Sequence, residues 1–367
     1  MTGIPAGGAT AHSAPLGFGG REIALMLSRR CNIACRHCGI ESSPLVRDRM
    51  SLEDATRFIV EAAGLNDFAK VTFTGGEPTL VRRDLLRLLS LCRDLGLTTR
   101  IVTNGWWAKK LDNGLDFLGK LQQAGLSELN FSADKFHLEF EPPEILRNGL
   151  ECARQLGYPR IVSFVSNADR DPFEEFSDLY GVPQDVLLDL RTILAAKQPL
   201  APYADDHVFL YFGGLIGLGR AANYPSELRY YPLDFFPLGS ACGEVVNKPV
   251  IYPDGAFQAC CCAGGKVGAF TVGNAHRESI ADLYDKMRAR SHFRLINLEG
   301  PRRLHEVMKA ARPDRDLPET YTSICELCVR STQGVPTEEV ENIVGDYMLK
   351  RLLDGLMPAG AAAETDP

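Results

Sequence analysis

The feature that most constrains the fold is an alternation of short apolar segments with amphipathic segments over residues 23–212. Short apolar runs predict buried strands, and an apolar residue at every third or fourth position predicts helices. Because a predicted helix separates most neighbouring strands, we expect one parallel sheet in an α/β fold. The predicted strands are Ile23–Ser28, Lys70–Thr74, Thr98–Thr103, Glu128–Ser132, Arg160–Ser166 and His207–Phe212, and the predicted helices are Leu52–Leu65, Arg82–Leu95, Gly114–Ala124, Pro143–Leu156 and Pro183–Lys197.

Three cysteines follow the first predicted strand with C-x₃-C-x₂-C spacing: Cys31, Cys35 and Cys38. Iron–sulfur cubanes are usually held by four thiolates, so three thiolates on one loop leave one iron open to another ligand. A structural zinc site is the alternative. Zinc favours paired C-x₂-C knuckles with two further ligands nearby, and the second cysteine pair lies far downstream at Cys325 and Cys328.

The second predicted strand ends in the run Gly75-Gly76-Glu77-Pro78. Glycines at a strand end allow close approach to the backbone, and the Glu77 carboxylate is suited to pairing with an ammonium group. Alone, this run is equally typical of an ordinary strand-to-loop turn.

One strand–helix unit after C-x₃-C-x₂-C, the glycine run makes the chain resemble the radical SAM superfamily. The resemblance implies a partial (β/α)6 radical SAM barrel. It also implies a 4Fe-4S cluster held by Cys31, Cys35 and Cys38, whose open iron binds S-adenosyl-L-methionine (SAM). In that family the glycine loop holds the methionine part of SAM, which assigns Gly75, Gly76, Glu77 and Pro78 to cofactor binding, with Glu77 on the ammonium. His37 stands where the family places an aromatic residue near the adenine; a surface loop histidine is the alternative.

Further candidates lie at the carboxyl ends of the predicted strands, where parallel sheets bind ligands. Asn104 is a candidate SAM contact or an ordinary Asn-Gly turn residue. Ser132 and Asp134 resemble fourth-strand positions that bind the ribose or methionine of SAM. His137 is a candidate for chemistry or a packing residue. Arg220, in a Gly-Arg-Ala segment similar to one in relatives, is a candidate cofactor contact or a solvated arginine.

A second set of thiols lies in the C-terminal part of the chain. The Pro-Asp-Gly run at residues 253–255 predicts a hairpin, which would bring Cys242 and Cys260 together. With Cys325 and Cys328 they form a four-thiolate set suited to a closed iron–sulfur cluster or to zinc. The spacing of this set resembles the SPASM and twitch extensions of radical SAM enzymes, in the shorter twitch form with one auxiliary 4Fe-4S cluster. Cys260 is the expected ligand of the three consecutive cysteines, and Cys261 and Cys262 are candidate hydrogen-atom donors.

These motifs predict a flexible tail over 1–20, a barrel over 21–240, a small α+β twitch/SPASM-like iron–sulfur domain over 241–333, a helix over 334–357 and a disordered tail over 358–367. The net charge of −7 and the scattered lysines and arginines give no support to a nucleic-acid partner. No segment has the length of a membrane span, and the N-terminal stretch lacks the basic start of a signal peptide. Eleven cysteines without such a signal favour reduced thiols and a cytoplasmic location.

The resemblance implies reductive cleavage of SAM to a 5′-deoxyadenosyl radical, followed by removal of a hydrogen atom from substrate. Similarity to peptide-modifying maturases makes oxidation or cross-linking of a ribosomally made peptide the first expectation. Oxidation or epimerisation of a small-molecule natural product of the sugar or aminoglycoside type is the second, and a non-catalytic zinc protein is the third. The expected electron donor is a flavodoxin- or ferredoxin-type protein.

Overall fold

The computed structural model describes residues 21–65, 68–167, 169–196, 198–200, 206–212, 215–261 and 266–356. The chain divides into two compact units. Unit 1 comprises Met1–Cys35 and Ser42–Gly213, and unit 2 comprises Arg36–Glu41 and Gly214–Pro367. The predicted tails over 1–20 and 358–367 lie outside the described residues, and the predicted domain boundaries stay predictions.

Unit 1 is built on a parallel sheet with the strand order β1-β2-β3-β4-β5-β7-β6. All six predicted strands are confirmed. The short edge strand β6 was not predicted, because its three residues lie inside the segment expected to form the helix Pro183–Lys197. That segment instead forms a 3₁₀ turn, β6 and the short helix α7. The strands are β1 Arg21–Ser28, β2 Phe68–Gly75, β3 Thr98–Thr103, β4 Glu128–Asp134, β5 Arg160–Val165, β6 Leu187–Asp189 and β7 Val208–Phe212.

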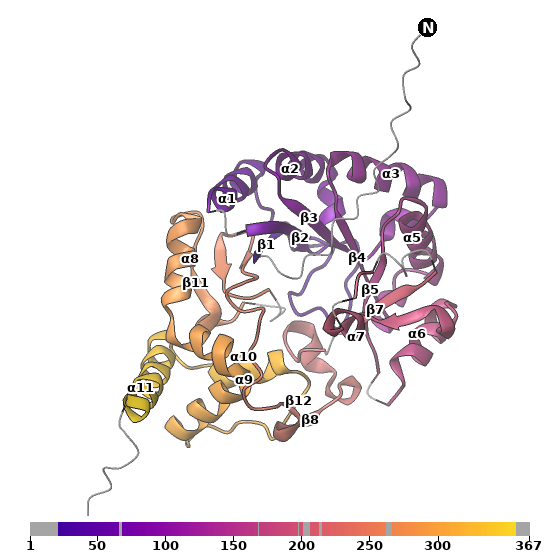
Figure 1. Ribbon diagram of the computed structural model, residues 1–367. Coiled ribbons are helices and arrows are strands. Elements are labelled where there is room, and N and C mark those ends of the chain that lie inside the picture. Colours follow the sequence, from indigo (N-terminus) through magenta and orange to yellow (C-terminus); the bar gives the residue numbers. More distant parts are fainter. Residues whose placement is uncertain are drawn as a thin grey trace, which may run out of the picture. The chain divides into compact units, whose positions relative to one another are not determined.

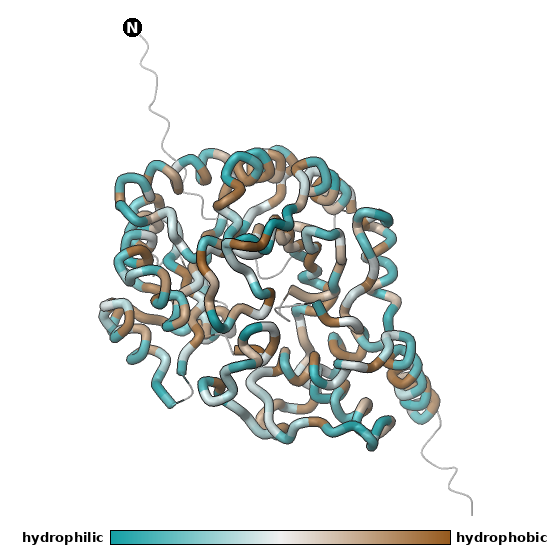
Figure 2. Tube along the Cα trace, turned by 180° about the vertical axis from the view of Figure 1, so that it is seen from behind, coloured by the Kyte–Doolittle hydropathy of each residue, from teal (hydrophilic) through white to brown (hydrophobic). Residues whose placement is uncertain are grey.

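Helices of unit 1 lie along the outer side of this sheet (Figure 1). In α2 the buried residues are Leu85, Leu88, Leu89 and Cys92, whose spacing forms one apolar stripe on the helix. In Figure 2, hydrophilic and hydrophobic residues alternate along the turns of the helices. The helices are α1 Leu52–Gly64, α2 Arg82–Asp94, α3 Leu111–Ala124, α4 Lys135–Leu138, α5 Pro143–Gln155, α6 Pro172–Tyr180 and α7 Leu190–Ala195, with 3₁₀ turns at Pro78–Val81, Trp106–Ala108 and Gln184–Val186.

A layer of buried charge links the first four strands near their amino ends. Arg100 on β3 donates to Glu128 at 2.6 Å and to Glu22 at 3.0 Å. Lys70 on β2 donates to Glu128 at 2.7 Å, and Thr72 donates to Glu22 at 2.5 Å. Burial alone would raise the pKa of Glu128, but Arg100 and Lys70 hold that pKa below its usual value. Two cations and two anions thus balance within the sheet, and unit 1 needs no solvent to neutralise them.

Unit 2 combines short antiparallel strands with four helices. The predicted hairpin is confirmed: β9 pairs with β10 across the Tyr252–Gly255 turn, and β10 pairs with β11. A separate two-stranded sheet joins β8 and β12. The elements are β8 Tyr231–Pro232, β9 Val250–Ile251, β10 Ala256–Gln258, β11 Thr271–Asn274, β12 Thr320–Tyr321, α8 Ile280–Ala289, α9 Ser291–Ala311, α10 Ile324–Thr332 and α11 Thr337–Leu356, with 3₁₀ turns at Gly219–Asn223, Pro225–Glu227, Leu233–Phe235 and Gly268–Phe270.

The C-terminal helix α11 packs on α9. Buried His292 of α9 bonds to the Glu341 carboxylate through Nδ1 and to the Ala269 carbonyl at 2.9 Å through Nε2. Burial would raise the pKa of Glu341, but His292 holds it below its usual value. This interaction fastens α11 to the core of unit 2. Among the described helices, none is both long and apolar enough to cross a membrane.

We predict that replacing Arg100 destabilises unit 1 strongly. Arg100→Met leaves Glu22 and Glu128 buried with less positive charge, which costs about 3–5 kcal/mol in comparable buried pairs. The matched control is Lys120→Met, which removes one partner of an exposed pair with Asp116 and should cost about 0–1 kcal/mol. The free energy of unfolding from urea titrations measures both. Equal losses of unfolding free energy in the two variants would show that the buried ion pairs stabilise unit 1 no more than an exposed pair does.

Candidate active site

The glycine run at the end of β2 is docked on the start of the cysteine loop. The Gly76 N–H donates to the Ser28 carbonyl at 2.8 Å, and the Glu77 N–H donates to the Arg30 carbonyl at 2.9 Å. A Cβ on Gly75 would lie 2.2 Å from the Ser28 oxygen, and one on Gly76 would lie 2.1 Å from the Arg30 oxygen. The chain's own cysteine loop therefore makes the close approach that requires both glycines.

The Glu77 side chain is a buried acceptor for four donors. Oε1 accepts from the Thr79 N–H at 3.1 Å, the Thr79 hydroxyl at 2.5 Å and the Thr103 hydroxyl at 2.8 Å. Oε2 accepts from the Asn104 N–H at 2.9 Å. Burial raises the pKa of Glu77, and these hydrogen bonds oppose the rise. Each carboxylate oxygen offers about two acceptor positions. Oε2 accepts one described N–H, so one acceptor position is left on Oε2.

Two tryptophans orient the threonines that hold Glu77. The Trp106 indole N–H donates to the Thr79 hydroxyl at 2.8 Å, and the Trp107 indole N–H donates to the Thr103 hydroxyl at 3.2 Å. Each hydroxyl accepts from an indole, so its own proton is directed to Glu77. The carboxylate position is thus fixed by two layers of hydrogen bonds.

Cys31 lies at one end of a chain of polar side chains. The Asn104 Nδ2 lies 3.7 Å from the Cys31 sulfur and 2.9 Å from the Asn32 Oδ1. The Asn32 Nδ2 in turn donates to the Glu141 carboxylate at 2.7 Å. Burial raises the pKa of Glu141 to about 7; the hydrogen bond from Asn32 opposes that rise and the charge of Glu77 adds to it.

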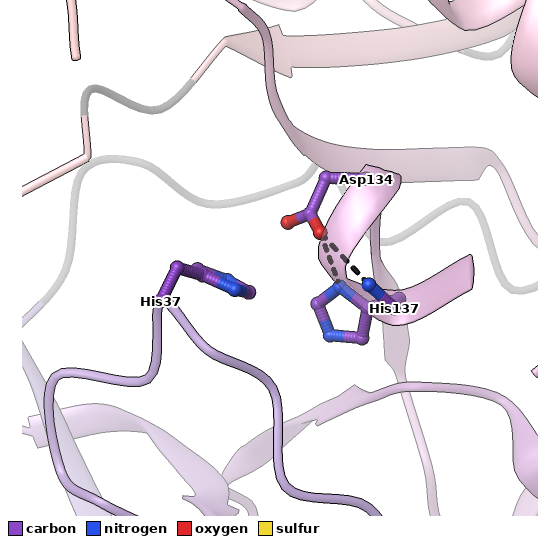
Figure 3. Close-up of side chains that lie close together, drawn as sticks. All are labelled: His37, Asp134 and His137. Carbon is purple, nitrogen blue, oxygen red and sulfur yellow. Dashed lines mark hydrogen bonds and ion pairs between the residues drawn. The ribbon is translucent and has the colours of Figure 1, made fainter. Parts of the chain in front are cut away.

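Cys35 lies beside the pair formed by Asp134 and His137. Asp134 caps α4 by accepting from the Phe136 and His137 N–H groups, and it also bonds to the His137 ring at 2.9 Å (Figure 3). Burial acts to lower the pKa of His137, but the Asp134 carboxylate and the Cys35 sulfur together raise it well above its usual value. Tyr180 donates to the Asp134 carbonyl at 3.1 Å. The predicted residues Asp134 and His137 thus form a hydrogen-bonded pair next to a predicted cluster ligand.

Cys38 and His37 belong to Arg36–Glu41, which is part of unit 2. Within that unit the Arg220 N–H donates to the Cys38 carbonyl at 3.2 Å. Gly219 has a φ of +56°, and a Cβ there would lie 2.5 Å from the Gly39 oxygen and 2.8 Å from the Cys38 oxygen. The described contact of Arg220 with this loop is therefore made by its backbone.

The four downstream thiols predicted to bind an auxiliary cluster gather in unit 2. Burial raises the pKa of Cys328 well above its usual value, and Cys242, Cys325 and Cys260 add to that rise. Burial also raises the pKa of Cys242; the Val245 and Glu244 backbone groups oppose the rise, whereas Cys260 and Cys325 add to it. Four interacting sulfurs are a donor set suited to iron or zinc.

A kink in α9 holds the Cys242 loop in place. Gly300 has a φ of +85°, and a Cβ there would lie 2.0 Å from the Ser240 carbonyl oxygen. The Cys242 N–H donates to the Ile296 carbonyl at 3.1 Å, and Asn297 donates to the Cys242 carbonyl at 3.2 Å. The close approach explains why glycine occupies the kink.

The remaining predicted residues are more scattered. Pro78 opens the 3₁₀ turn that Glu77 caps, and Ser132 lies on β4 opposite Ser163. Cys261 donates its N–H to the Lys248 carbonyl at 3.0 Å. Cys262 lies outside the described residues.

The site also contains residues that the sequence motifs did not indicate, among them Asn32, Thr103 and Glu141. Asn32 directly follows Cys31 in the C-x₃-C-x₂-C motif. Its place in that motif is the one sequence feature that could have indicated a role in the site. Thr103 and Glu141 carry no motif of their own. The fold brings them to Glu77 and to the cysteine loop.

The residues present fit an iron–sulfur cluster and SAM. Cys31, Cys35 and Cys38 supply three thiol groups, and thiolates are the preferred ligands of such clusters. The glycine run fixes the start of the loop next to Cys31, and the Glu77 carboxylate retains an acceptor position on Oε2.

Comparison with known families agrees with this geometry. The sequence model described as the radical SAM superfamily matches residues 25–179, which include Cys31, Cys35, Cys38 and Glu77. Residues 25–179 of the chain therefore match a radical SAM domain.

Similar proteins extend the comparison. YydG of Bacillus subtilis (strain 168), whose name assigns it to peptide biosynthesis, is 22% identical over 319 residues, which cover 84% of this chain and 91% of YydG. A Methanopyrus kandleri protein named for GTP 3′,8-cyclase activity is 28% identical over 66% of this chain and 76% of its own. A PqqA peptide cyclase of Methylorubrum populi is 36% identical over 29% of this chain and 26% of its own. The solved structure of BtrN in complex with AdoMet and 2-DOIA has a TM-score of 0.43 at 16% identity and covers 77% of this chain and 88% of that chain.

We predict that Glu77→Gln destabilises the strand-end loop. The two carboxylate oxygens each accept a backbone N–H, from Thr79 and from Asn104. Either orientation of a glutamine amide turns its NH₂ group toward one of these donors, at a cost of about 1–3 kcal/mol. Thermal unfolding of the variant measures this loss. The control, Glu319→Gln on an exposed residue, should leave the melting temperature unchanged. A wild-type melting temperature in Glu77→Gln would contradict the described network.

Proposed function

We propose that this chain reductively cleaves SAM and uses the resulting radical to oxidise or cross-link a ribosomally made peptide. The observation that carries the proposal is the docking of the cysteine loop on the Gly75–Pro78 run, because it joins a three-thiol loop to a carboxylate able to hold an ammonium. The peptide substrate is supported by the similarity to YydG, which extends over 84% of this chain. The PqqA peptide cyclase supports it over a shorter stretch.

In this proposal Cys31, Cys35 and Cys38 hold a 4Fe-4S cluster, and Glu77 receives the methionine ammonium of SAM at Oε2. The reduced cluster and SAM, when bound, supply a 5′-deoxyadenosyl radical that removes a hydrogen atom from substrate. Burial of Glu77 and Asp134 excludes water from the groups that orient the cofactor. A flavodoxin- or ferredoxin-type protein supplies the electron.

The thiols of unit 2 are proposed to hold an auxiliary 4Fe-4S cluster. Burial and the neighbouring sulfurs raise the pKa values of Cys242 and Cys328, and metal binding would release the thiol protons and pair the thiolates with positive charge. A second cluster offers an acceptor for the electron that an oxidised product must lose.

A small-molecule substrate is the second candidate. The similarity to the GTP 3′,8-cyclase protein of Methanopyrus kandleri covers 76% of that relative at 28% identity, and its name describes action on a nucleotide. The reaction of this second candidate is the oxidation or epimerisation of a small-molecule natural product of the sugar or aminoglycoside type.

We predict about eight iron atoms per reconstituted chain, four in each cluster. Replacing Cys31, Cys35 and Cys38 by Ala should leave about four and abolish formation of 5′-deoxyadenosine from SAM and dithionite. Replacing Cys325 and Cys328 by Ala should also leave about four but preserve some cleavage. Iron analysis and chromatography of the nucleoside measure these outcomes.

Replacement of Cys92 by Ala is the control, because this buried thiol lies on α2 and should leave both readouts unchanged. A colourless protein that binds zinc and makes no 5′-deoxyadenosine would overturn the proposed enzymatic function. Cleavage that persists in the Cys31, Cys35, Cys38 triple variant would overturn the assigned cluster.

We predict that product formation from a peptide encoded near the gene removes two hydrogens without incorporating deuterium from D₂O. Oxidation or cross-linking gives a mass loss of two hydrogens, whereas epimerisation in D₂O adds one deuterium at the inverted carbon. Mass spectrometry of the product distinguishes them. If the product contains deuterium, and the deuterium is lost in Cys261→Ala or Cys262→Ala, the reaction is an epimerisation and the proposed oxidation is wrong.

A further inference from the structure

We propose that Asn104 is a positioning residue that sets the reduction potential of the cluster assigned to Cys31, and that Asn32 and Glu141 hold it in place. This inference rests on the proposed function, because it requires a cluster on the cysteine loop. It assigns a new role to three side chains: Asn32 on the loop after β1, Asn104 directly after β3, and Glu141 between α4 and α5.

The contacts form an unbroken path. The Asn104 Nδ2 lies 3.7 Å from the Cys31 sulfur and 2.9 Å from the Asn32 Oδ1, and the Asn32 Nδ2 lies 2.7 Å from the Glu141 carboxylate. All the residues on this path belong to unit 1, and Cys31, Asn104 and Glu141 are buried. The sulfur therefore has an amide donor that solvent competes with only weakly.

The direction of this path is fixed by its two amides. The Asn32 Oδ1 accepts from the Asn104 Nδ2, so Asn32 presents its NH₂ group to Glu141. At the other end the Trp106 backbone N–H donates to the Asn104 Oδ1 at 3.1 Å. Asn104 must therefore direct its NH₂ group toward Asn32 and Cys31. Neither amide can be reversed without breaking a hydrogen bond.

An N–H donor directed at a ligand sulfur acts on the cluster's potential. Reduction adds negative charge that is shared with the thiolates, and a donor to sulfur stabilises that charge. The effect is larger in a buried site because the local dielectric is low. The Asn104 amide should therefore make the cluster easier to reduce.

Asn104 also links this effect to the glycine run. Its backbone N–H holds the Glu77 Oε2 at 2.9 Å, while its side chain reaches Cys31. The carboxylate proposed to bind the SAM ammonium and a ligand of the cluster are thus both held by one residue at the end of β3. A change in the side chain alone can test the contact with sulfur without removing the contact with Glu77.

The test is a redox titration of the reconstituted protein followed by electron paramagnetic resonance. The SAM-site cluster is identified as the one whose signal changes on addition of SAM. Asn104→Ser retains an oxygen that can accept from Trp106 but has no group that reaches sulfur, and Asn104→Leu loses both interactions. Both variants should show a more negative midpoint potential for this cluster, with iron content equal to wild type.

Glu141 provides the matched pair of variants. Glu141→Gln keeps an acceptor for Asn32 and should keep the wild-type potential, whereas Glu141→Leu releases Asn32 and should shift the potential in the same negative direction. A wild-type potential in Asn104→Ser would overturn the assigned role of Asn104, and one in Glu141→Leu would overturn the holding role of Glu141. If Asn104→Leu loses iron, Asn104→Ser and Glu141→Leu decide the outcome. A wild-type protein without a SAM-responsive cluster would instead overturn the proposed function itself.

Discussion

The candidate site depends on the contact between the backbone of residues 28–30 and the glycine run of β2. Two hydrogen bonds, from Gly76 to Ser28 and from Glu77 to Arg30, fix the start of the cysteine loop against the end of the neighbouring strand. Side chains at either glycine would separate the two segments. Because the loop begins at this contact, the directions of Cys31 and Cys35 follow from it, and so does their access to Asn104 and His137.

Charge is arranged differently at the two ends of the unit 1 sheet. Near the amino ends, Lys70 and Arg100 neutralise Glu22 and Glu128 within the protein. Near the carboxyl ends, Glu77 is surrounded by neutral donors, and the pKa of Glu141 is raised because its burial is only partly offset by Asn32. A neutralised layer stabilises a fold, whereas a buried carboxyl held by neutral donors favours a cationic ligand, because the ligand's charge opposes the rise in its pKa. The carboxyl ends are therefore the end of the sheet where a charged cofactor gains most.

The strands and the cysteine loop could be predicted because their signals are local. Apolar runs identify β1 to β5 and β7, and the spacing of Cys31, Cys35 and Cys38 is visible within eight residues. The strand β6 has three residues next to a helical stretch, too few for periodicity to separate it from that helix. Glu141 could not be found either, because its contact with Asn32 joins residues 109 positions apart. Such contacts depend on the register of the sheet, which no short motif records.

The two thiol sets illustrate how far chemistry can be inferred from position. Cys31 interacts with the side chain of Asn104, and Cys35 with that of His137. At Cys242, burial raises the pKa of the thiol, and backbone groups of Val245 and Glu244 oppose that rise. Side-chain donors can change by substitution and so can adjust a potential, but backbone donors are a fixed property of the loop. In the proposed function, side-chain substitution would adjust the potential of a cluster at Cys31, whereas the Gly300 kink would position the loop of one at Cys242.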